Sequence, residues 1–473
     1  MTSDNLRDLV DDIVQRKYES QNIELKKAKD GVPKRLYDTL SSFSNQNGGG
    51  IIVFGIDEVN DYDIVGVCDV QLLQKKVAEQ CGQMQPKVRP VFSYVTIDGK
   101  DIVSIEIGEC DIYEKPCYYM GKGKFLGSYI RVGEADNPMS DFEIYTFEAF
   151  KRKIQDEIRV VENATASELA SDKIDDYYHK LKDVKPQLYK LGLDEVLKLQ
   201  NILAPMPTVS GFMLFGKYPQ LRFPQLSIIA SVVPGELIGE MNADGERFLD
   251  DKRIEGTIPE MLEGALDFVK RNMKRGIAFD ASTNRIDAPE YPLLAIREVI
   301  LNALVHRDYS IHTENCPIQI LMFSNRIEVT NPGGLYGRTS VDQLGKISVE
   351  VRNPFMASAL EAMISSENRY SGIPTIRAEM KRYELESPLF ENIRGNFKVT
   401  LFNKKANNNS LIEDIIAFCK VPRSREEIAN HFNVSSVPYF MTRYIWPLMA
   451  VGRIKETLPD KPRSKNQKYY SVY

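Results

Sequence analysis

The sequence predicts a multidomain protein of the α/β (α+β) class. At 473 residues the chain is too long for one hydrophobic core, and it suggests about three domains. Alternating apolar strand patterns are interspersed with amphipathic helix patterns in two long stretches. A charged helical stretch and the polar segment Asn403–Ser410 separate these stretches from each other and from a C-terminal segment. We therefore expect domains at residues 1–150, 206–405 and 410–473, with a helical connector at 151–205.

The composition is that of an ordinary soluble protein, with 43% apolar and 27% charged residues. The first residues, MTSDNLRDLVDD, are too polar for a signal peptide, and no apolar run approaches the roughly 20 residues that span a membrane. The six cysteines form no CxxC pair and no zinc-ligand spacing. We expect a cytoplasmic protein with reduced thiols and without a membrane partner.

Charge is distributed unevenly along the chain. The net charge of −5 argues against a general nucleic-acid binder. Residues 411–473, however, carry 10 Lys and Arg against 6 Asp and Glu, whereas residues 1–150 carry 17 against 25. The C-terminal segment is therefore the best candidate for contact with nucleic acid.

The N-terminal region reads as a small α/β domain that ends near Phe150. A glycine run, Asn47-Gly48-Gly49-Gly50, separates a helix from an apolar strand, and Asp98-Gly99-Lys100 joins two strands into a hairpin. A further strand pair is expected at Tyr118–Val132, around a Gly/Lys loop. The expected elements are helix Lys34–Gln46 and strands Ile51–Ile56, Phe92–Ile97 and Ile102–Ile107.

Two segments of this region, ESQNIELK and SNQNGGGIIVFGIDE, resemble the Schlafen/AlbA-like domain. In the animal Schlafen nucleases, two glutamates and an aspartate form a metal-dependent RNase site, and the resemblance places them at Glu19, Glu24 and Asp57. Such carboxylate sets hold divalent ions. Alternatively, Glu24 pairs with Lys26 at the surface and Glu19 caps a loop. A spacing of five puts Glu19 and Glu24 on opposite strand faces, unless Glu19 precedes the strand.

Basic residues gather at the entrance to the first predicted helix of this domain. They could follow a phosphate backbone of RNA or single-stranded DNA. The acidic balance of the domain favours the alternative, a solvated helix entrance. The residues are Lys26, Lys27, Lys29, Lys34 and Arg35.

The middle of the chain is expected to begin with strands Thr208–Gly216 and Gln225–Val233 and a long amphipathic helix, Ile258–Arg275. The helix predicted at Leu294–Ser310 then places Glu298 and Asn302 one turn apart on one side. A carboxylate can orient or deprotonate water, and an amide oxygen can ligate a magnesium ion that also holds phosphate. The alternative is a buried helix with two exposed polar residues.

Downstream of this helix come two glycine-containing signals. Pro317–Thr330 predicts a hairpin with its turn at Ser324-Asn325, and it is followed by Asn331-Pro332-Gly333-Gly334. Ser371-Gly372-Ile373-Pro374 then opens a helix with proline at its first position. The free backbone N–H groups of such a helix start suit phosphate.

This order of motifs resembles the ATP-binding fold of gyrase, histidine kinases and MutL (the GHKL type). IREVILNALVHRDY, IEVTNPGG and SGIPTI resemble more closely its RecG-related branch, across most of Thr208–Phe402. The resemblance implies ATP and Mg as cofactors. Asn302 would hold magnesium through ATP, and Glu298 would activate water in an ATPase. The nucleotide would contact Arg307, Asn331, Gly333, Gly334 and Gly372.

The sequence departs from the wider superfamily at two points. Asn331 stands where the adenine-reading aspartate is normal, so the acceptor carries no charge. Only Gly372 remains of the second glycine box. Weaker binding and slow or absent hydrolysis are therefore expected. Arg307, at the helix end, could instead satisfy backbone carbonyls, and His306 is not assigned a catalytic role.

The C-terminal segment predicts a winged helix. Helices Leu411–Cys419 and Arg425–Phe432, the latter capped by Ser424 and Glu427, are followed by a third that ends at Met449. Two strands around the basic tip Lys461–Lys465 complete the pattern. Such a module binds double-stranded DNA, with Tyr439 and Arg443 at the groove and Arg463 and Lys465 at phosphates. Dimerisation or protein docking is the alternative use.

Together these features favour an ATP-binding, DNA-binding transcriptional regulator that forms a homo-oligomer. The alternative is a metal-dependent nuclease, acting on RNA or single-stranded DNA in a Schlafen-like defence system gated by ATP. A third option is an assembly scaffold with a degenerate nucleotide pocket. The sequence contains no GxxxxGK[ST] phosphate loop, so helicase motor activity is not expected.

Overall fold

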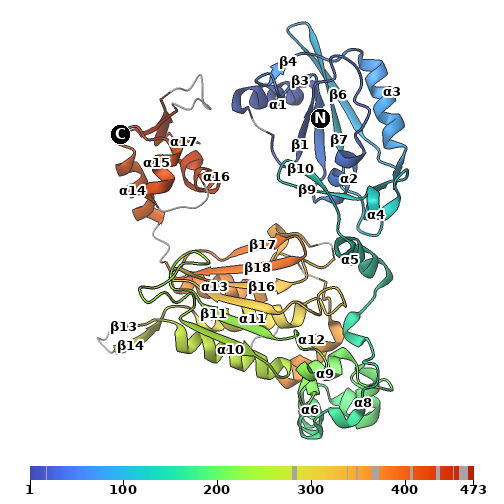
Figure 1. Cartoon of the computed structure of the whole chain (residues 1–473), viewed down its shortest axis with the longest axis vertical. Helices are drawn as coiled ribbons and strands as arrows, with labels where there is room; N and C mark the ends of the chain where they lie inside the picture. Colours follow the sequence, from blue (N-terminus) through green and yellow to red (C-terminus); the bar gives the residue numbers. More distant parts are fainter. Residues whose placement is uncertain are drawn as a thin grey trace. The chain divides into compact units, whose positions relative to one another are not determined.

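The computed structural model describes residues 1–17, 19–279, 285–337, 339–347, 350–364, 372–404, 408–432, 437–450, 452–457 and 467–472. The chain divides into two compact units, one of Tyr145–Ala406 and one of Met1–Ile144 with Asn407–Tyr473. The mixed α/β, multidomain class that the sequence predicts is confirmed (Figure 1). Within the described ranges, no helix is long and apolar enough to span a bilayer.

The N-terminal region is built on a four-stranded sheet in the order β1-β2-β7-β6. Strand β1 pairs with β2 in parallel, and the other neighbours are antiparallel. Side chains alternate between two cores. Val53 packs with α1 on one face, whereas Ile52 and Phe54 pack with α2 and α3 on the other. The bounds are α1 Ser3–Arg16, β1 Ile23–Lys26, α2 Tyr37–Asn45, β2 Gly50–Phe54, α3 Val70–Cys81, β6 Val91–Ile97 and β7 Lys100–Ile107.

The strand pair expected at Tyr118–Val132 is not formed as predicted. Strand β8 pairs with β5, and β9 forms a hairpin with β10 that turns at Gly133, where φ is +62°. The Gly/Lys loop contains the short helix α4. An isolated antiparallel bridge between Tyr118 and Ser128 joins its two sides, in place of the predicted ladder between β8 and β9. The bounds are β3 Ile56–Asp57, β4 Asp63–Ile64, β5 Met84–Gln85, β8 Tyr118–Tyr119, α4 Gly123–Gly127, β9 Tyr129–Val132, β10 Ala135–Pro138 and α5 Asp141–Arg152.

The second unit opens with short helices that pack into its main core. The segment expected to be a connector contributes buried Tyr177, Leu181 and Val196 to that core, so it is an integral part of the unit. The predicted strand Thr208–Gly216 is wrong, because residues Val209–Phe215 form helix α9. All seven of them are buried. The segment therefore shows neither the 3.6-residue apolar repeat of a half-exposed helix nor the two-residue alternation of a half-exposed strand. The other bounds are η1 Asp156–Ile158, η2 Ala166–Glu168, α6 Ser171–Val184, α7 Pro186–Tyr189, α8 Leu193–Leu199 and η3 Pro219–Leu221.

A six-stranded sheet, in the order β12-β11-β15-β16-β18-β17, forms the centre of this unit. Only β11 and β15 are parallel neighbours. Helices α10 and α11 pack against the sheet, and α13 packs against α11 (Figure 1). The bounds are β11 Ile228–Val232, β12 Asp250–Ile254, α10 Ile258–Asn272, β13 Arg275–Phe279, β14 Arg285–Pro289, α11 Leu293–His306, β15 Ile318–Met322, β16 Arg326–Pro332, η4 Val341–Gln343, α12 Pro354–Met363, α13 Gly372–Arg382, β17 Leu389–Ile393 and β18 Asn396–Phe402.

The C-terminal segment has a small core of its own around Ile415, Ile428 and Ile445. Its expected capping box is present, because Glu427 N donates to Ser424 Oγ and Ser424 N donates to the Glu427 carboxylate. The elements are α14 Asn408–Phe418, α15 Arg425–His431, α16 Val437–Phe440, the π-helical turn η5 Met441–Ile445, α17 Trp446–Ala450, and the paired strands β19 Ile454–Glu456 and β20 Tyr469–Ser471.

Candidate functional site

Helix α11 carries Glu298 and Asn302 one turn apart. Glu298 is 7% exposed, and its carboxylate lies 3.4 Å from Arg297 Nη1. Burial raises the pKa of Glu298, and Arg297 opposes this shift. A buried carboxyl beside a half-buried carboxamide is a pair suited to holding a water molecule or a polar ligand.

Asn302 lies against the start of helix α13. A Cβ added to Gly372, the first residue of α13, would lie 3.7 Å from Asn302 Nδ2 and 3.9 Å from Oδ1. The structure therefore brings together the amide of α11 and the backbone N–H groups at a helix start, which are far apart in sequence. This is the arrangement expected for an oxygen that ligates a cation beside a phosphate.

Asn331 contributes an acceptor that the protein leaves unsatisfied. It is 4% exposed, and its Oδ1 has no hydrogen-bond partner among the described residues. On strand β16 it shares a face with buried Ile327 and Val329, the face on which α11 packs. Asp308 N donates to Pro332 O over 3.0 Å, which ties the end of α11 to the end of β16. An orphaned acceptor in this position fits the amino group of an adenine.

Gly333 and Gly334 are explained by packing within the protein. Gly333 has a φ of +103°, and a Cβ there would lie 2.2 Å from Arg352 Nη1 and 3.0 Å from Asp308 N. A Cβ on Gly334 would lie 2.6 Å from Asn392 Oδ1. The backbone conformation and packing of Gly333 therefore require glycine before any ligand is considered, whereas at Gly334 only the tip of the Asn392 side chain would have to move.

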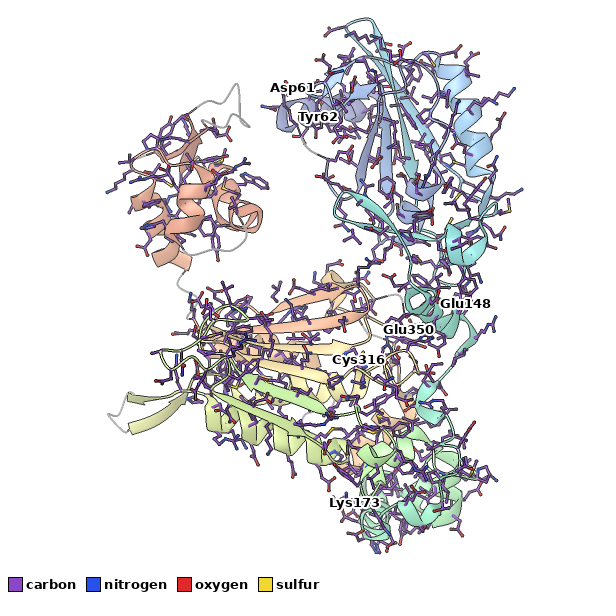
Figure 2. The ribbon with its side chains drawn as sticks, viewed as in Figure 1. Asp61, Tyr62, Glu148, Lys173, Cys316 and Glu350 are labelled. Carbon is purple, nitrogen blue, oxygen red and sulfur yellow. The ribbon has the colours of Figure 1, made fainter. Side chains whose placement is uncertain are left out.

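Arg307 follows α11 and is buried, at 2% exposure. Its Nη2 donates to the carbonyl oxygens of Thr313, at 2.9 Å, and Cys316, which is labelled in Figure 2. The helix ends at His306, so the expected continuation through Asp308 is wrong. The observed contacts of Arg307 are those of the alternative, a helix-end arginine that satisfies carbonyls. Burial lowers the pKa of His306 to about 4, so its imidazole is neutral at pH 7.

A polar network at the end of α11 was missed in the sequence. Arg352 Nη1 lies 3.0 Å from Asp308 Oδ2, and Arg352 Nη2 donates to Gly334 O over 2.8 Å. Asn353 Nδ2 donates to the carbonyl oxygens of Val305 and Arg307. The partners come from segments that are far apart in the sequence, so no local sequence pattern could predict these contacts. The network holds the glycine turn against the helix end.

In the N-terminal region, Glu19 and Glu24 do meet, because Glu19 precedes strand β1 as their convergence required. They meet at a guanidinium. Arg131 Nη1 lies 2.7 Å from Glu24 Oε2 and 3.1 Å from Asp136 Oδ1, and Arg131 Nη2 lies 3.7 Å from Glu19 Oε2. We call these four residues the Arg131 cluster. Glu24 also pairs with Lys26, as the surface-pair alternative proposed.

Asp57 does not join this cluster. Its Oδ2 lies 3.2 Å from Lys27 Nζ and accepts from Asn60 Nδ2 over 2.8 Å. Over the described part of the chain, no group of three or more His, Cys, Asp or Glu residues could hold a metal ion. The expected carboxylate triad is therefore not assembled in this structure.

The predicted DNA-contacting side chains fall outside the described part of the structure. Arg463 and Lys465 lie outside the described residues, and so do the side chains of Tyr439 and Arg443. The backbone of Tyr439 lies in α16 and that of Arg443 in η5.

Family comparisons match three separate regions. Residues 19–140 match the model described as "Schlafen, AlbA_2", and residues 315–401 match HATPase_c_4, described as "Putative ATP-dependent DNA helicase recG C-terminal". The chain combines a Schlafen AlbA_2 domain with a RecG-related ATPase-like domain. Residues 411–470 match the C-terminal domain of Fic-like proteins, Fic standing for filamentation induced by cAMP. The first two domains indicate an ATP-dependent function related to nucleic acid.

Solved structures that are similar to the chain include the following two. The DIP2311 protein from Corynebacterium diphtheriae is 15% identical, with a TM-score of 0.41, over 98% of this chain and 96% of that one. The N-terminal domain of a RecG-related protein from Nitrosomonas europaea is 31% identical, with a TM-score of 0.23, over 28% of this chain and 90% of that one. The comparison with curated proteins gives no match.

Proposed function

We propose that the protein is an ATP-binding transcriptional regulator that binds double-stranded DNA. The observation that carries the nucleotide half of this proposal is the buried, partnerless Oδ1 of Asn331, on the face of β16 that α11 covers. An unpaired buried acceptor costs about 1–3 kcal/mol, which a donor from a bound ligand would recover. The residues present fit an adenine nucleotide.

Within this site, Asn331 would accept from the adenine amino group, and Asn302 would hold a magnesium ion beside the start of α13. A bound Mg–ATP would supply phosphate charge and its own counterion. Glu298, whose pKa burial raises, would orient or deprotonate a water molecule in slow ATP hydrolysis. Arg307 is held by loop carbonyls and is not needed for this assignment.

The DNA half of the proposal rests on the C-terminal segment. Three helical stretches followed by two antiparallel strands occur there in the order of a winged helix, and the segment is basic in an acidic chain. We assign Tyr439 and Arg443 to the groove, and Arg463 and Lys465 to phosphates. RNA or single-stranded DNA at the N-terminal domain, a homo-oligomeric state and a cytoplasmic location complete the proposal.

The nuclease alternative has weaker support. A divalent ion needs several carboxylate oxygens free to converge, but Glu19 and Glu24 already face the guanidinium of Arg131. Asp57 is engaged with Lys27 instead.

The test is thermal stabilisation by ATP and ADP, with and without magnesium. A ligand at 100 times its dissociation constant stabilises the fold by roughly 2.7 kcal/mol. Asn302→Ala should remove most of the magnesium-dependent part, and Glu298→Ala should keep binding but abolish any phosphate release. Gln319→Ala removes a carboxamide from the outer side of β15 and serves as the matched control. An unchanged melting temperature at millimolar ATP would show that the pocket is vestigial.

A further inference from the structure

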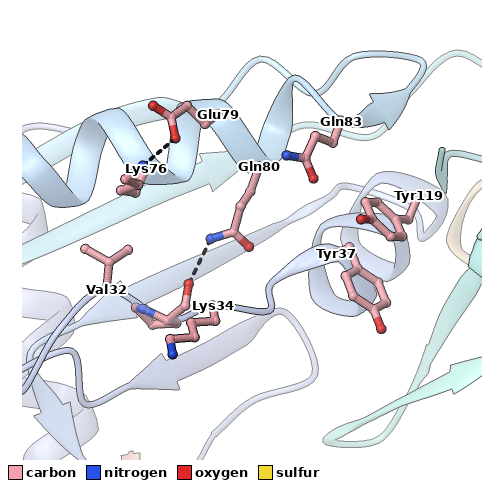
Figure 3. A pocket seen from close by; sticks show the side chains of 9 residues that line it. Val32, Lys34, Tyr37, Lys76, Glu79, Gln80, Gln83 and Tyr119 are labelled. Carbon is pink, nitrogen blue, oxygen red and sulfur yellow. Dashed lines mark hydrogen bonds and ion pairs between the residues drawn. The ribbon is translucent and has the colours of Figure 1, made fainter. Parts of the chain in front are cut away.

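A cavity of about 290 Å³ lies in the AlbA_2 domain, away from the Arg131 cluster residues. Its walls come from the segment before α2, from α3 and its C-terminal end, and from strand β8. Figure 3 shows Tyr37 and Tyr119 together at one side of it and Lys34 and Lys76 toward the other. Gln80 fixes one wall, because its side chain donates to Pro33 O and accepts from Leu36 N.

The aromatic side of the cavity is preorganised. The rings of Tyr37 and Tyr119 are stacked, with centroids 4.5 Å apart and an angle of 12° between planes. Lys122 Nζ lies 4.9 Å from the Tyr37 centroid and donates to Tyr129 Oη over 3.1 Å. This ammonium group contacts tyrosine hydroxyls. Among the described residues, no carboxylate pairs with it. The hydrogen bonds that Lys122 donates to the tyrosine hydroxyls of Tyr37 and Tyr129 raise its pKa.

The charge of the cavity is positive after local pairs are removed. Lys76 is compensated by Glu79 at 2.9 Å, and Arg35 by Asp38 at 3.0 Å. Lys34 has no carboxylate partner in the part of the chain that the structure describes. Two uncompensated cations therefore lie near the stacked rings. Lys34 lines the cavity, and Lys122 lies beside it, over the Tyr37 ring.

We propose that this cavity binds a nucleoside phosphate, with the base against the tyrosine pair and the phosphate drawn to Lys34 and Lys122. Stacked aromatic surface tolerates any base because every base has a π-face, and ammonium groups supply the attraction for phosphate. The cavity volume suits one nucleotide and lies near the lower end of the range of volumes of small-ligand sites, which begins at about 300 Å³. The same chemistry is offered by a free mononucleotide and by the terminal nucleotide of a single strand.

Binding of three probes to the full-length chain tests this site: AMP, inorganic phosphate, and a 5′-phosphorylated eight-nucleotide thymidine strand. Each probe is titrated calorimetrically on an Asn331→Leu background, which removes the oxygen proposed to accept from adenine at the α11 site. Lys34→Ala should weaken AMP or strand binding about fivefold, as expected for one lost phosphate contact, and should lower its salt dependence. Lys29→Ala removes another exposed lysine of this domain that does not line the cavity, and it should leave binding within about twofold.

Tyr119→Leu should weaken both nucleotide probes and leave inorganic phosphate unaffected, because it removes a stacked ring that lines the cavity and no side-chain contact of Lys34 or Lys122. Binding of AMP assigns the site to a free nucleotide, and binding of the strand alone assigns it to a strand end. Equal effects of Lys34→Ala and Lys29→Ala, or no binding of either nucleotide probe at millimolar concentration, would overturn the proposal. Because every variant carries Asn331→Leu, which removes the adenine contact of the proposed ATP site, this outcome is distinguishable from a failure of that site.

Discussion

At the scale of single residues, Asn331 lowers the stability of the unliganded fold. Its amide oxygen is buried on the helix-facing side of β16 and accepts no hydrogen bond from any described residue. An apolar side chain of similar shape in that place would avoid the desolvation cost. A polar residue in this place is what we expect if a ligand supplies the missing donor.

This reasoning predicts opposite effects of Asn331→Leu on folding and on binding. The unliganded variant should be as stable as the parent or more stable, by up to about 2 kcal/mol, because no hydrogen bond is lost. Its thermal stabilisation by ATP should disappear. Urea unfolding with and without ATP measures both quantities. A destabilised variant that still responds to ATP would show that Asn331 is a structural residue.

The residues that escaped sequence reasoning share one physical property. Arg131, Arg352 and Asn353 act through partners distant in sequence, and ion pairs of that kind leave no local period or spacing. Glu298 and Asn302, by contrast, belong to one helix, so their common side was predictable from the 3.6-residue repeat. Whether they serve a nucleotide stays a prediction.

At the scale of elements, local sequence patterns predicted helices and strands well where one face of the element is exposed to solvent. Helix α10, the hairpin of β6 and β7 and the capping box of α15 were predicted close to their observed bounds. Helix α9 was mistaken for a strand because it is buried on all sides. Periodicity carries information only when some positions are exposed.

Helix α12 begins on a buried carboxyl group. Glu157, fully buried, accepts from Phe355 N at 3.0 Å and from Met356 N at 2.7 Å. Burial outweighs these bonds and raises the pKa of Glu157 to about 7. Between about pH 4.5 and 7 the folded protein keeps a proton that the unfolded chain releases, so stability falls as pH rises through this window.

Glu157→Gln should flatten that part of the pH profile. The full span from 4.5 to about 7 corresponds to a contribution on the order of 3 kcal/mol, since each pKa unit is worth about 1.4 kcal/mol. Unfolding by urea at several pH values between 4 and 8 gives the slope for each protein. An unaltered slope in the variant would assign the titration to another group.

The C-terminal segment yields a prediction about duplex DNA. Changing Arg463 and Lys465 together to alanine should weaken binding of any sequence and reduce the salt slope by roughly one unit per lost phosphate contact. Arg443→Ala should instead blunt preference among sequences. Fluorescence anisotropy across a salt series measures both. If deleting residues 410–473 leaves the duplex affinity unchanged, this segment serves protein docking or dimerisation instead of DNA binding.

At the scale of the whole molecule, the chain joins an AlbA_2 domain and an ATPase-like domain, each with its own core. The proposed role as a regulator predicts that the protein does not cut nucleic acid. Wild-type protein incubated with manganese or magnesium should leave structured RNA and single-stranded DNA intact in a gel assay. Cleavage that is lost in Glu24→Gln would instead establish the nuclease alternative.

The Arg131 cluster also bears on what the N-terminal domain requires from its surroundings. Three carboxylates face one guanidinium, and burial raises the pKa of Glu19 to about 7, so a proton occupies part of that site near neutrality. A guanidinium and a proton thus provide the charge balance that a divalent cation provides in an acidic metal site. We therefore predict that the domain folds without a divalent cation. Its melting temperature should be the same in a chelator as in millimolar magnesium, and it should decline as the pH rises from about 4.5 to about 7.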